Sequence, residues 1–570
     1  MKILLMVSPN FSIKMIEEEI VNQKTGSCDF TKSVDWRPGS PVGILYIAAS
    51  LRDAGHDVKI YDLHRSLYKC REKGYFKTNS LEDFFEEYFD KILKNDDFDV
   101  LGISSLFNVS SSSVQHMAAR FRKVCPSAKI IMGGHYPTNM YKQVLESENC
   151  DYVILGEAEK QFLWLLNVID DAAVTDKISG NPHVVDVNCL NNPDKTPAII
   201  DDIDSLPAPA WELLPHISDY IDNSIHAKRL ASSKSAPKTR SAALVTTRGC
   251  PMRCTFCAGH SVHGRTVRAH SIDYMMKHID WLVDNYDINS LLIRDDMFNF
   301  SSERAIQFCR TLVEKYQDRF TLIFPSGMAV WKLNEDLIIS LKTAGMKSIE
   351  IAVESGSRYV QKHIVKKNLN LNVVKEKVEL LKKHDIAVRA FYIVGLVGET
   401  KEMMEETVQF ALDLNIDWSE LKIFTPLIGS EMYEIAKEKG CLVGDMSEHV
   451  YGRCCIRTDE FTPEEIKEIQ YDGNIRINFL NNRFLKTEQY LKAENVFKSL
   501  LNSFPGHLFA QWGLWQALKG QGETNLAGQA LAELHELADQ SKRNSDLLKR
   551  YHIELPKTNE MCCSGMEQTV

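Results

Sequence analysis

The sequence predicts an α/β protein with a doubly wound parallel sheet, then a partial (βα)6 barrel, then a small α-helical region. Short apolar runs alternate with longer amphipathic stretches five times in residues 1–168 and six times in residues 241–440. Beyond about residue 486 only helix-like patterns remain. At 570 residues the chain can also bury at least two separate cores.

Composition narrows the class of protein. A hydrophobic fraction of 44% and a charged fraction of 25% are typical of soluble globular proteins. The formal net charge of -10 disfavours a nucleic-acid partner. We find no apolar run of about 18 residues, so no membrane span is expected. The first residues predict a strand, not a signal peptide, and the 14 cysteines are scattered with only one tight cluster, so we expect a cytoplasmic protein.

Five strand-like runs define the first domain, residues 1–168. They are Ile3–Val7, Val58–Tyr61, Val100–Ser104, Lys129–Met132 and Tyr152–Leu155. Helix candidates lie at 42–54, 80–94, 111–124, 138–147 and 158–168. Ligands of such sheets bind beyond the carboxyl ends of the strands, where small residues let a large ligand approach the backbone. The candidates there are Ser104, Ser105, Gly133, Gly134, Gly156 and Glu157. Taken singly, each pair also fits an ordinary turn.

Residues 169–240 lose this periodicity and gain Asp, Asn, Pro and Ser, which predicts a linker. The predicted barrel, 241–440, has strands at 243–247, 290–295, 320–325, 348–353, 387–394 and 418–425. Its helices are expected at 271–285, 302–316, 335–344, 371–384, 402–413 and 430–438. Six repeats are too few to close an eight-fold barrel, and chemistry in such barrels sits at the carboxyl ends of the strands.

The first barrel strand leads into a loop with three cysteines at C-x3-C-x2-C spacing, Cys250, Cys254 and Cys257. A loop of this length can point three thiolates at one centre. Three ligands on a cubane iron–sulfur cluster leave one iron open to bind a small molecule. The alternatives are a zinc site completed by His260 or His263, and a disulfide.

With Phe256 before the last cysteine, this loop resembles the signature of the radical SAM enzymes. The resemblance implies a catalytic [4Fe-4S] cluster held by the three cysteines, with S-adenosylmethionine chelated at its open iron. One electron from the cluster then cleaves the sulfonium to methionine and a 5′-deoxyadenosyl radical. An electron donor such as flavodoxin or ferredoxin is expected to supply it.

Polar groups follow the other barrel strands, in segments that also resemble the family pattern. Asp296 is a candidate for the ammonium group of S-adenosylmethionine, Glu354 for its ribose hydroxyls and Arg389 for its carboxylate. The further cofactor-binding candidates are Ser355, Tyr392 and Gly395. The alternatives are a solvated turn or a helix N-cap for Asp296 and a structural ion pair for Arg389.

The first domain resembles the Rossmann-like cobalamin-binding domain that precedes the TIM-type barrel in a large radical SAM subfamily. The matching stretches are 41–49, Asp62, 132–138 and 151–159. Asp62 and His64 look like the start of the D-x-H-x-x-G motif that supplies a cobalt-ligating histidine. Leu67 replaces the glycine of that motif, so we interpret both as turn residues and expect cobalamin to bind without a protein imidazole.

The remaining chain divides into a barrel-associated extension at 441–485, a helical region at 486–545 and a tail at 546–570. The helical region resembles one to two tetratricopeptide repeats. It is a candidate docking site for a protein partner, and simple packing is the alternative. Cys441, Cys454 and Cys455 form no second C-x-x-C pair, so an auxiliary cluster is not expected.

The resemblance implies a cobalamin-dependent radical SAM enzyme that acts on a small-molecule substrate or biosynthetic intermediate. C-methylation of an unactivated carbon is the leading hypothesis. The alternatives are an oxidative cyclase similar to the anaerobic magnesium-protoporphyrin monomethyl ester cyclases or a rearrangement enzyme, without methyl transfer. A non-enzymatic sensor that binds the cluster and cobalamin is the second alternative.

Overall fold

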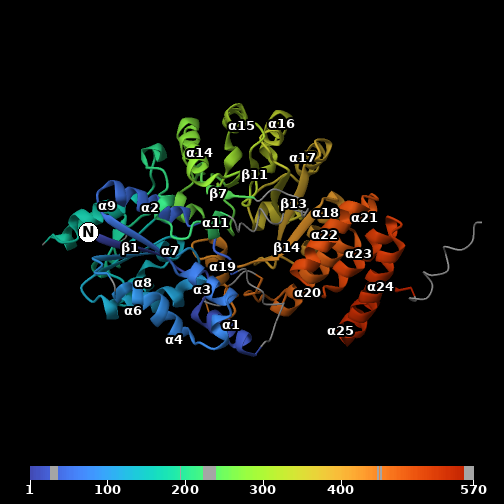
Figure 1. The fold of residues 1–570 in the computed structure, drawn as a ribbon, viewed down its shortest axis with the longest axis horizontal. Helices are drawn as coiled ribbons and strands as arrows, with labels where there is room; N and C mark the ends of the chain where they lie inside the picture. The colour runs from blue at the N-terminus through green and yellow to red at the C-terminus, as the bar shows by residue number, and fades with distance from the viewer. Residues whose placement is uncertain are drawn as a thin grey trace, which may run out of the picture.

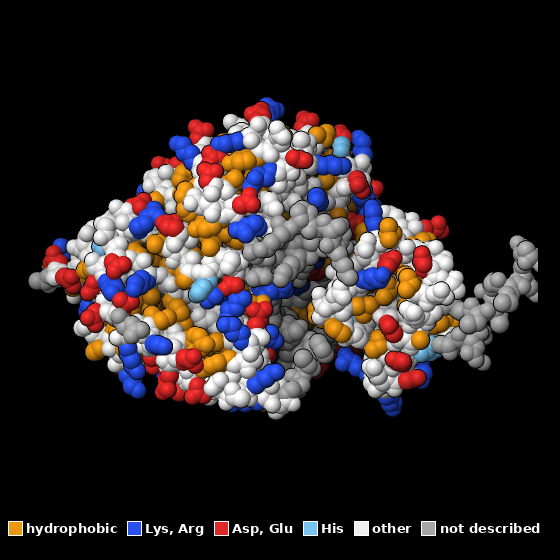
Figure 2. Space-filling model, in the orientation of Figure 1, with side chains coloured by type: hydrophobic (Ala, Val, Ile, Leu, Met, Phe, Trp, Pro, Cys, Tyr) orange, Lys and Arg blue, Asp and Glu red, His pale blue; other side chains and the backbone are white. Residues whose placement is uncertain are grey.

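The computed structural model describes residues 1–25, 36–94, 96–171, 173–192, 194–221, 239–445, 449 and 452–556. An α/β domain, a half-open barrel and a helical region follow one another along the long axis (Figure 1). On the face shown in Figure 2, acidic and basic side chains are interspersed over the described part of the chain. Within the described residues, we find no helix long and apolar enough to cross a bilayer.

The first domain is a six-stranded sheet with the order β2-β1-β3-β4-β5-β6. Its parallel strands are β1 (Lys2–Val7), β2 (Asp57–Asp62), β3 (Val100–Ser104), β4 (Lys129–Gly133) and β5 (Tyr152–Ile154). The edge strand β6 (Val184–Val185) is antiparallel and lies in the predicted linker. Residues 3–6 of β1 are all buried because helices cover both faces of the sheet. The predicted doubly wound sheet is therefore present, with one added edge strand.

Helices occupy all five predicted positions of this domain, two of them interrupted, and further helices are present that the sequence did not predict. They are α1 (Ile13–Thr25), α2 (Val42–Asp53), α3 (Leu63–Glu72), α4 (Leu81–Phe84), α5 (Lys91–Lys94), α6 (Ser111–Val124), α7 (His135–Asn139), α8 (Tyr141–Glu146), α9 (Glu159–Val168) and α10 (Val174–Gly180). The expected helix at 138–147 is two short helices, and a π-helical turn, Phe85–Asp90, joins α4 to α5. The sequence did not predict α1 and α3, whose buried residues include Ile16, Ile20 and Leu67.

The linker region packs against both domains. Trp211 is fully buried and donates from Nε1 to Nε2 of His278 at 3.0 Å, on the first helix of the barrel. Asp204 accepts from Nδ1 of His270 at 2.8 Å. Residues 202–214 are therefore part of the core that joins the two domains, although their sequence lacks any periodic pattern.

The barrel consists of two three-stranded parallel sheets, ordered β11-β10-β7 and β12-β13-β14. Its strands are β7 (Ser241–Leu244), β10 (Ser290–Ile293), β11 (Thr321–Ile323), β12 (Ser348–Glu354), β13 (Ala387–Val394) and β14 (Trp418–Ile423). Parallel bridges from Leu322 to Met346 and from Met328 to Ile351 join the two sheets. The result is an open six-stranded barrel, as the six repeats predict.

Each barrel strand is followed by a helix on the outer side (Figure 1). The helices are α14 (Ile272–Tyr286), α15 (Ser302–Tyr316), α16 (Glu335–Thr343), α17 (Leu371–Lys383), α18 (Lys401–Leu414) and α19 (Glu431–Glu438). Near the first strand, a short hairpin of β8 (Thr247–Arg248) and β9 (Arg268–Ala269) encloses the cysteine loop and α13 (His260–His263). All six predicted helices are therefore present, and the hairpin is an addition.

The C-terminal helices build a separate hydrophobic core. They are α20 (Pro463–Ile475), α21 (Arg483–Lys486), α22 (Tyr490–Ser503), α23 (Leu508–Gly520), α24 (Thr524–Asp539) and α25 (Lys542–Arg550). A Cβ at Gly513 would lie 2.4 Å from the Phe497 ring, so this glycine allows α22 and α23 to pack closely. The buried thiols of Cys454 and Cys455 lie on the extension before these helices. The end of the predicted tail, from residue 557 onward, lies outside the described residues.

Candidate functional site

A cavity of about 240 Å³ lies where the carboxyl ends of the two parallel sheets face each other. Its first wall comes from the α/β domain and includes Ser104, Gly133, Gly134, Gly156 and Glu157. Its second wall comes from the barrel and includes Val245, Thr247, Arg248, Arg294 and Asp296. Five of the six strand-end residues predicted in the first domain therefore line one cavity, and they share it with the first two barrel strands.

The first wall contains glycines in backbone conformations that other residues rarely adopt. Gly134 has φ +99°, and a Cβ there would lie 2.4 Å from the carbonyl oxygen of Ser105. Gly156 has φ +78°, and its Cβ would lie 2.5 Å from the carbonyl oxygen of Ala198. Only glycine fits such positions, because a Cβ there would collide with neighbouring backbone, so the glycines let adjacent turns pack closely at the wall of the cavity. Ser105 is the exception among the candidates, because its buried hydroxyl lies 2.9 Å from that of Ser110 and does not line the cavity.

Asp62 and His64 are not the turn residues that we predicted, since Asp62 ends β2 and His64 lies in the first turn of α3. Asp62 caps α3 by accepting from the amide of Arg65 at 2.8 Å. His64 is buried, with Nδ1 accepting from the Asn10 amide at 3.2 Å and Nε2 3.0 Å from the carbonyl oxygen of Trp36. Both ring nitrogens are engaged, and His64 is not part of the cavity lining. The first wall therefore fits cobalamin bound without this imidazole.

The cysteine loop follows β8 and is fixed by backbone hydrogen bonds. Gly249 has φ +88° and donates its amide to Oδ2 of Asp296 at 2.8 Å. At the far end, Thr255 donates from its amide to the carbonyl oxygen of Val365 at 3.1 Å and accepts from the amide of Met432 at 2.7 Å. The loop is thus attached to three other segments of the barrel before any ligand binds.

The three thiols are free, with Cys257 the most exposed. Burial is the main reason that the pKa of Cys254 rises to about 12, while the positive charge of Lys367 lowers it and the neighbouring Glu354, Cys257 and Cys250 raise it. Within the described residues, no three Cys, His, Asp or Glu side chains already form a metal site. The donor set still suits an iron–sulfur cluster, since thiolates are the usual ligands and the three share one loop.

One of the two histidines named for the zinc alternative contacts the other domain. His263 Nδ1 lies 2.9 Å from Oε1 of Glu157 in the other domain. Phe256 is partly buried and packs against the main core. The loop therefore offers three sulfur ligands and an aromatic side chain, with His263 held across the domain boundary.

Two further candidates lie close to the cysteine loop. Asp296 is exposed at the cavity wall. Glu354 is buried at the end of β12 with φ +69°, at an irregularity in the pairing of β12 with β13, and its Oε1 lies 3.0 Å from Nζ of Lys367. Lys367 also acts electrostatically on Cys250 and Cys254. No motif or strand end marks Lys367, which follows β12 by more than ten residues.

The structure does not bring the other barrel candidates to the cavity. Arg389 is the third residue of β13, far from its carboxyl end, and donates from Nη2 to Glu420 at 2.5 Å, the ion pair named as its alternative. Tyr392 is fully buried on the helix-facing side of the same strand. The Ser355 hydroxyl lies 3.0 Å from that of Thr407, and the Gly395 amide donates to Oε2 of Glu399 at 2.8 Å. A strand alternates its faces, so adjacent residues in the sequence point to opposite sides.

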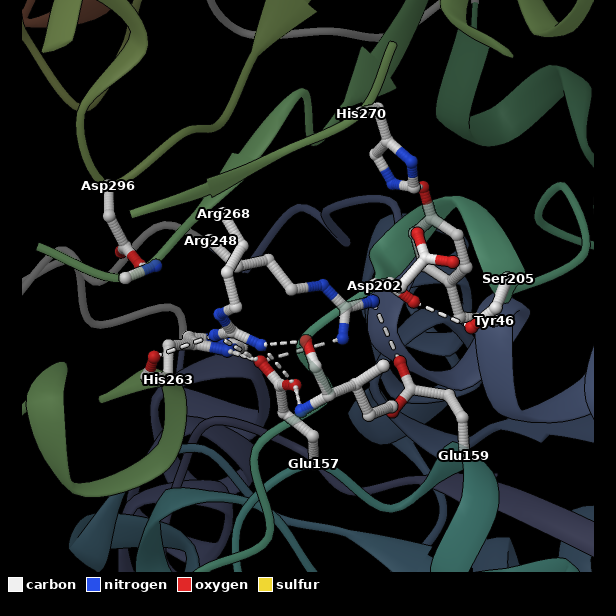
Figure 3. A network of polar contacts seen from close by, with 12 residues as sticks. Tyr46, Glu157, Glu159, Asp202, Ser205, Arg248, His263, Arg268, His270 and Asp296 are labelled. Atoms are coloured by element: carbon white, nitrogen blue, oxygen red, sulfur yellow. Dashed lines mark hydrogen bonds and ion pairs between the residues drawn. The ribbon is translucent and has the colours of Figure 1, made fainter. Parts of the chain in front are cut away.

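A network of ion pairs across the domain boundary was not predicted (Figure 3). Arg248 is buried, donates from Nη2 to Oε1 of Glu159 at 2.7 Å and lies with its guanidinium 4.9 Å from the centre of the Tyr46 ring. Arg268 donates from Nη1 and Nη2 to the two carboxylate oxygens of Glu157, at 2.7 and 2.9 Å. These residues bracket the cysteine loop on either side, so the first domain fixes the loop at both ends.

The charges in this network compensate one another. Burial alone would raise the pKa of Glu157, but the bonds from His263 and Arg268 and the charge of Arg248 outweigh it and lower the pKa to about 2. The buried carboxylate therefore stays ionised between its cations. Sequence alone does not reveal such pairs, because Glu157 and Arg268 are 111 residues apart.

Comparison with known proteins identifies two families in the chain. Residues 37–166 match the B12 binding domain, and residues 244–411 match the Radical SAM superfamily. Each match lies inside one of the two predicted α/β domains. The cofactors expected from the sequence, cobalamin and S-adenosylmethionine, correspond to these two families.

Relatives span most of the chain. Cytidylyl-2-hydroxyethylphosphonate methyltransferase of Streptomyces wedmorensis is 26% identical, covering 72% of this chain and 80% of that protein. The anaerobic magnesium-protoporphyrin IX monomethyl ester cyclase of Rubrivivax gelatinosus is 26% identical over 64% of this chain and 63% of its own length. The solved structure of the radical S-adenosylmethionine methyltransferase TsrM from Kitasatospora setae, with cobalamin and a [4Fe-4S] cluster bound, shares the fold at 15% identity, with TM-score 0.52 and coverage of 78% and 80%. With the glycine wall and the residues that flank the cysteine loop lining one cavity, these matches place the chain in the family of radical SAM enzymes that carry a B12-binding domain.

Proposed function

We propose that this protein methylates an unactivated carbon of a small-molecule substrate in a cobalamin-dependent radical SAM reaction. The observation that carries the proposal is the single cavity between the glycine wall and the barrel wall that adjoins the cysteine loop. When bound, the cluster and S-adenosylmethionine supply a hydrogen-abstracting radical, and cobalamin supplies the methyl group. Both groups must reach one substrate carbon, so a shared cavity is the arrangement that the reaction needs.

The residues of this chain have distinct roles in the proposal. Cys250, Cys254 and Cys257 hold the cluster, and Asp296 fixes the start of their loop through the Gly249 amide. Gly134 and Gly156 line the opposite wall, which in this proposal contacts the corrin face, and allow the turns of that wall to pack closely. The apolar lining near them, which includes Leu5, Ile103 and Met132, limits the access of water to a reactive intermediate.

The relatives support two outcomes of the same radical chemistry. One is a methyltransferase and the other an oxidative cyclase, by their names. We favour methylation because the relative that matches more of this chain, and the solved structure of the same fold, are both methyltransferases. The electron for the cluster comes, in this proposal, from a small redox protein such as flavodoxin or ferredoxin.

The test is anaerobic incubation of the reconstituted protein with a chemical reductant and methyl-labelled S-adenosylmethionine. We expect both 5′-deoxyadenosine and label on cobalamin. Deoxyadenosine with unlabelled cobalamin would replace methylation by the cyclase or rearrangement alternative. A protein that binds both cofactors but forms neither product, with or without candidate substrates, would favour the sensor alternative.

A further inference from the structure

Arg294 stands out among the charged side chains of the cavity. It follows β10 directly, lines the cavity and is exposed there. Asp296, two residues later, also lines the cavity, whereas Asp295 between them is buried and does not line it. The Asp295 carboxylate accepts from the amide and the hydroxyl of Thr246, each at 2.5 Å. The chain thus directs one cation and one anion into the cavity and buries the residue between them.

Within the described residues, the Arg294 guanidinium makes no hydrogen bond or ion pair. Arg248, the other arginine in the cavity lining, is paired with Glu159. A guanidinium carries five N–H donors and stays protonated in proteins. A cation that lines the cavity without a protein partner is available to form charge-assisted hydrogen bonds with a bound anion.

We propose that Arg294 binds an oxyanion, a carboxylate or a phosphate-type group, carried by the substrate. This inference rests on the proposed function, since it places the substrate between the glycine wall and the cysteine loop. The planar fork of arginine suits two oxygens of one such group. Asp296 beside it disfavours a second negative charge at the same point, so the anion is expected to bind on the side of Arg294 away from the cysteine loop.

Both cofactors also carry oxyanions, so the experiment has to distinguish them from the substrate. Lys367 and Arg265 act on the Cys250 thiol, so the carboxylate of S-adenosylmethionine has other positive charge near the cluster. The glycine wall offers no lysine or arginine among its lining residues, so the phosphodiester of cobalamin is the competing occupant that the test must separate from the substrate.

The test uses holoenzyme with cluster and hydroxocobalamin, and inorganic phosphate as the probe. Phosphate binding is followed by phosphorus NMR line broadening in the absence of S-adenosylmethionine and reductant. We expect Arg294→Gln to weaken phosphate binding at least tenfold, with Arg294→Lys intermediate. Arg310→Gln on the outer face of α15 is the matched control, because that arginine is exposed and outside the cavity. It should bind phosphate like the unaltered protein.

Three results would overturn the inference. Equal phosphate binding by Arg294→Gln and the unaltered protein would remove Arg294 as the anion site. Competitive displacement of phosphate by S-adenosylmethionine would assign the guanidinium to the cofactor carboxylate. Loss of hydroxocobalamin from Arg294→Gln on desalting would assign it to the cobalamin phosphodiester. Binding is measured without turnover, so failure of the methylation proposal in the labelling experiment would be seen separately.

Discussion

The two walls of the cavity are built in opposite ways. The first uses absent side chains, with Gly134 and Gly156 at backbone conformations that other residues rarely adopt. The second uses charge, with Arg248, Arg294 and Asp296 at the ends of barrel strands. A wall of glycine backbone and mainly apolar side chains selects a ligand by shape and surface contact, whereas a wall with several charges selects by sign and geometry. Substitutions in the two walls should therefore impair the protein in different ways.

The largest effect is expected on the barrel side. Replacing Cys250, Cys254 and Cys257 together by serine should abolish reductive cleavage of S-adenosylmethionine, because the cluster loses its protein ligands. Cobalamin should remain bound, since the glycine wall is untouched. The measurements are 5′-deoxyadenosine by chromatography and the cobalamin spectrum after desalting. Cys125→Ser changes a half-buried thiol far from the loop and serves as the control. Cleavage retained by the triple variant would contradict the cluster assignment.

Substitutions in the glycine wall should reduce stability and cobalamin retention through steric clashes. Gly134→Ala places a Cβ 2.4 Å from a carbonyl oxygen at φ +99°, which we expect to cost about 1–3 kcal/mol and to reduce cobalamin retention. Gly528→Ala is the matched control. It lies inside α24 with nothing within 4 Å of its Cβ and should stabilise the protein by up to about 1 kcal/mol. Chemical denaturation and cobalamin retention test both variants. A Gly134→Ala protein with full retention would mean that this wall does not contact the ligand.

The contribution of Glu157, at the boundary between the walls, to the free energy of unfolding should depend on pH. The folded-state pKa of Glu157 is about 2, below its ordinary value of 4.5, so its ionised form stabilises the fold at neutral pH. That difference corresponds to about 3 kcal/mol, which is lost as the pH falls from about 4.5 towards 2. Glu157→Gln should therefore be less stable than the unaltered protein at pH 7, and the gap should narrow below about pH 4.5.

Urea denaturation at pH 7, 4.5 and 3.5 provides the measurement for this variant. Glu212→Gln is the control, because Glu212 pairs with Arg52 on the exposed surface. Such a pair should contribute less than about 1 kcal/mol. A gap between Glu157→Gln and the unaltered protein that stays constant over this range would show that the carboxylate acts through packing and not through charge.

The smallest effect is expected at Tyr46, which contacts both walls. Tyr46→Phe keeps the ring beside Arg248 and removes the hydroxyl, which lies 3.3 Å from Nε2 of His270. We expect a loss of about 1 kcal/mol in the free energy of unfolding. Tyr46→Leu also removes the ring and should cost more, by about 1–2 kcal/mol. Equal stability of the two variants would show that the ring adds nothing to the position of Arg248.

Local patterns predicted the fold well. Alternating apolar runs located every barrel strand and helix, because each buried element repeats its own period. Two helices of the first domain, α1 and α3, were not recognised, and the predicted linker contains Trp211 and Asp204, which join the domains. Those contacts depend on which surfaces meet in three dimensions, and a single sequence does not encode that in a local pattern.

The candidate site was predictable only where a motif or a strand end marked it. The cysteine spacing and the glycines beyond the first-domain strands are such marks. Arg389 looked equivalent to Glu354, but it lies near the start of β13 and pairs with Glu420. The partners of Arg248 and Arg268 come from a domain about a hundred residues earlier in the chain. Long-range pairing of this kind follows from docking of complete domains and has no signature in the sequence.

The ion pairs on either side of the cysteine loop have a consequence for the synthesis of the protein. Glu157 and Glu159 leave the ribosome before Arg248 and Arg268, and domains generally fold in that order. The carboxylates are therefore in place when the loop emerges, and the loop closes onto a finished surface. If the cluster were delivered before residue 268 had been translated, the first domain could not yet hold the loop at both ends. Biogenesis thus favours a sequence of events in which the first domain folds, the loop docks and the metal is inserted last.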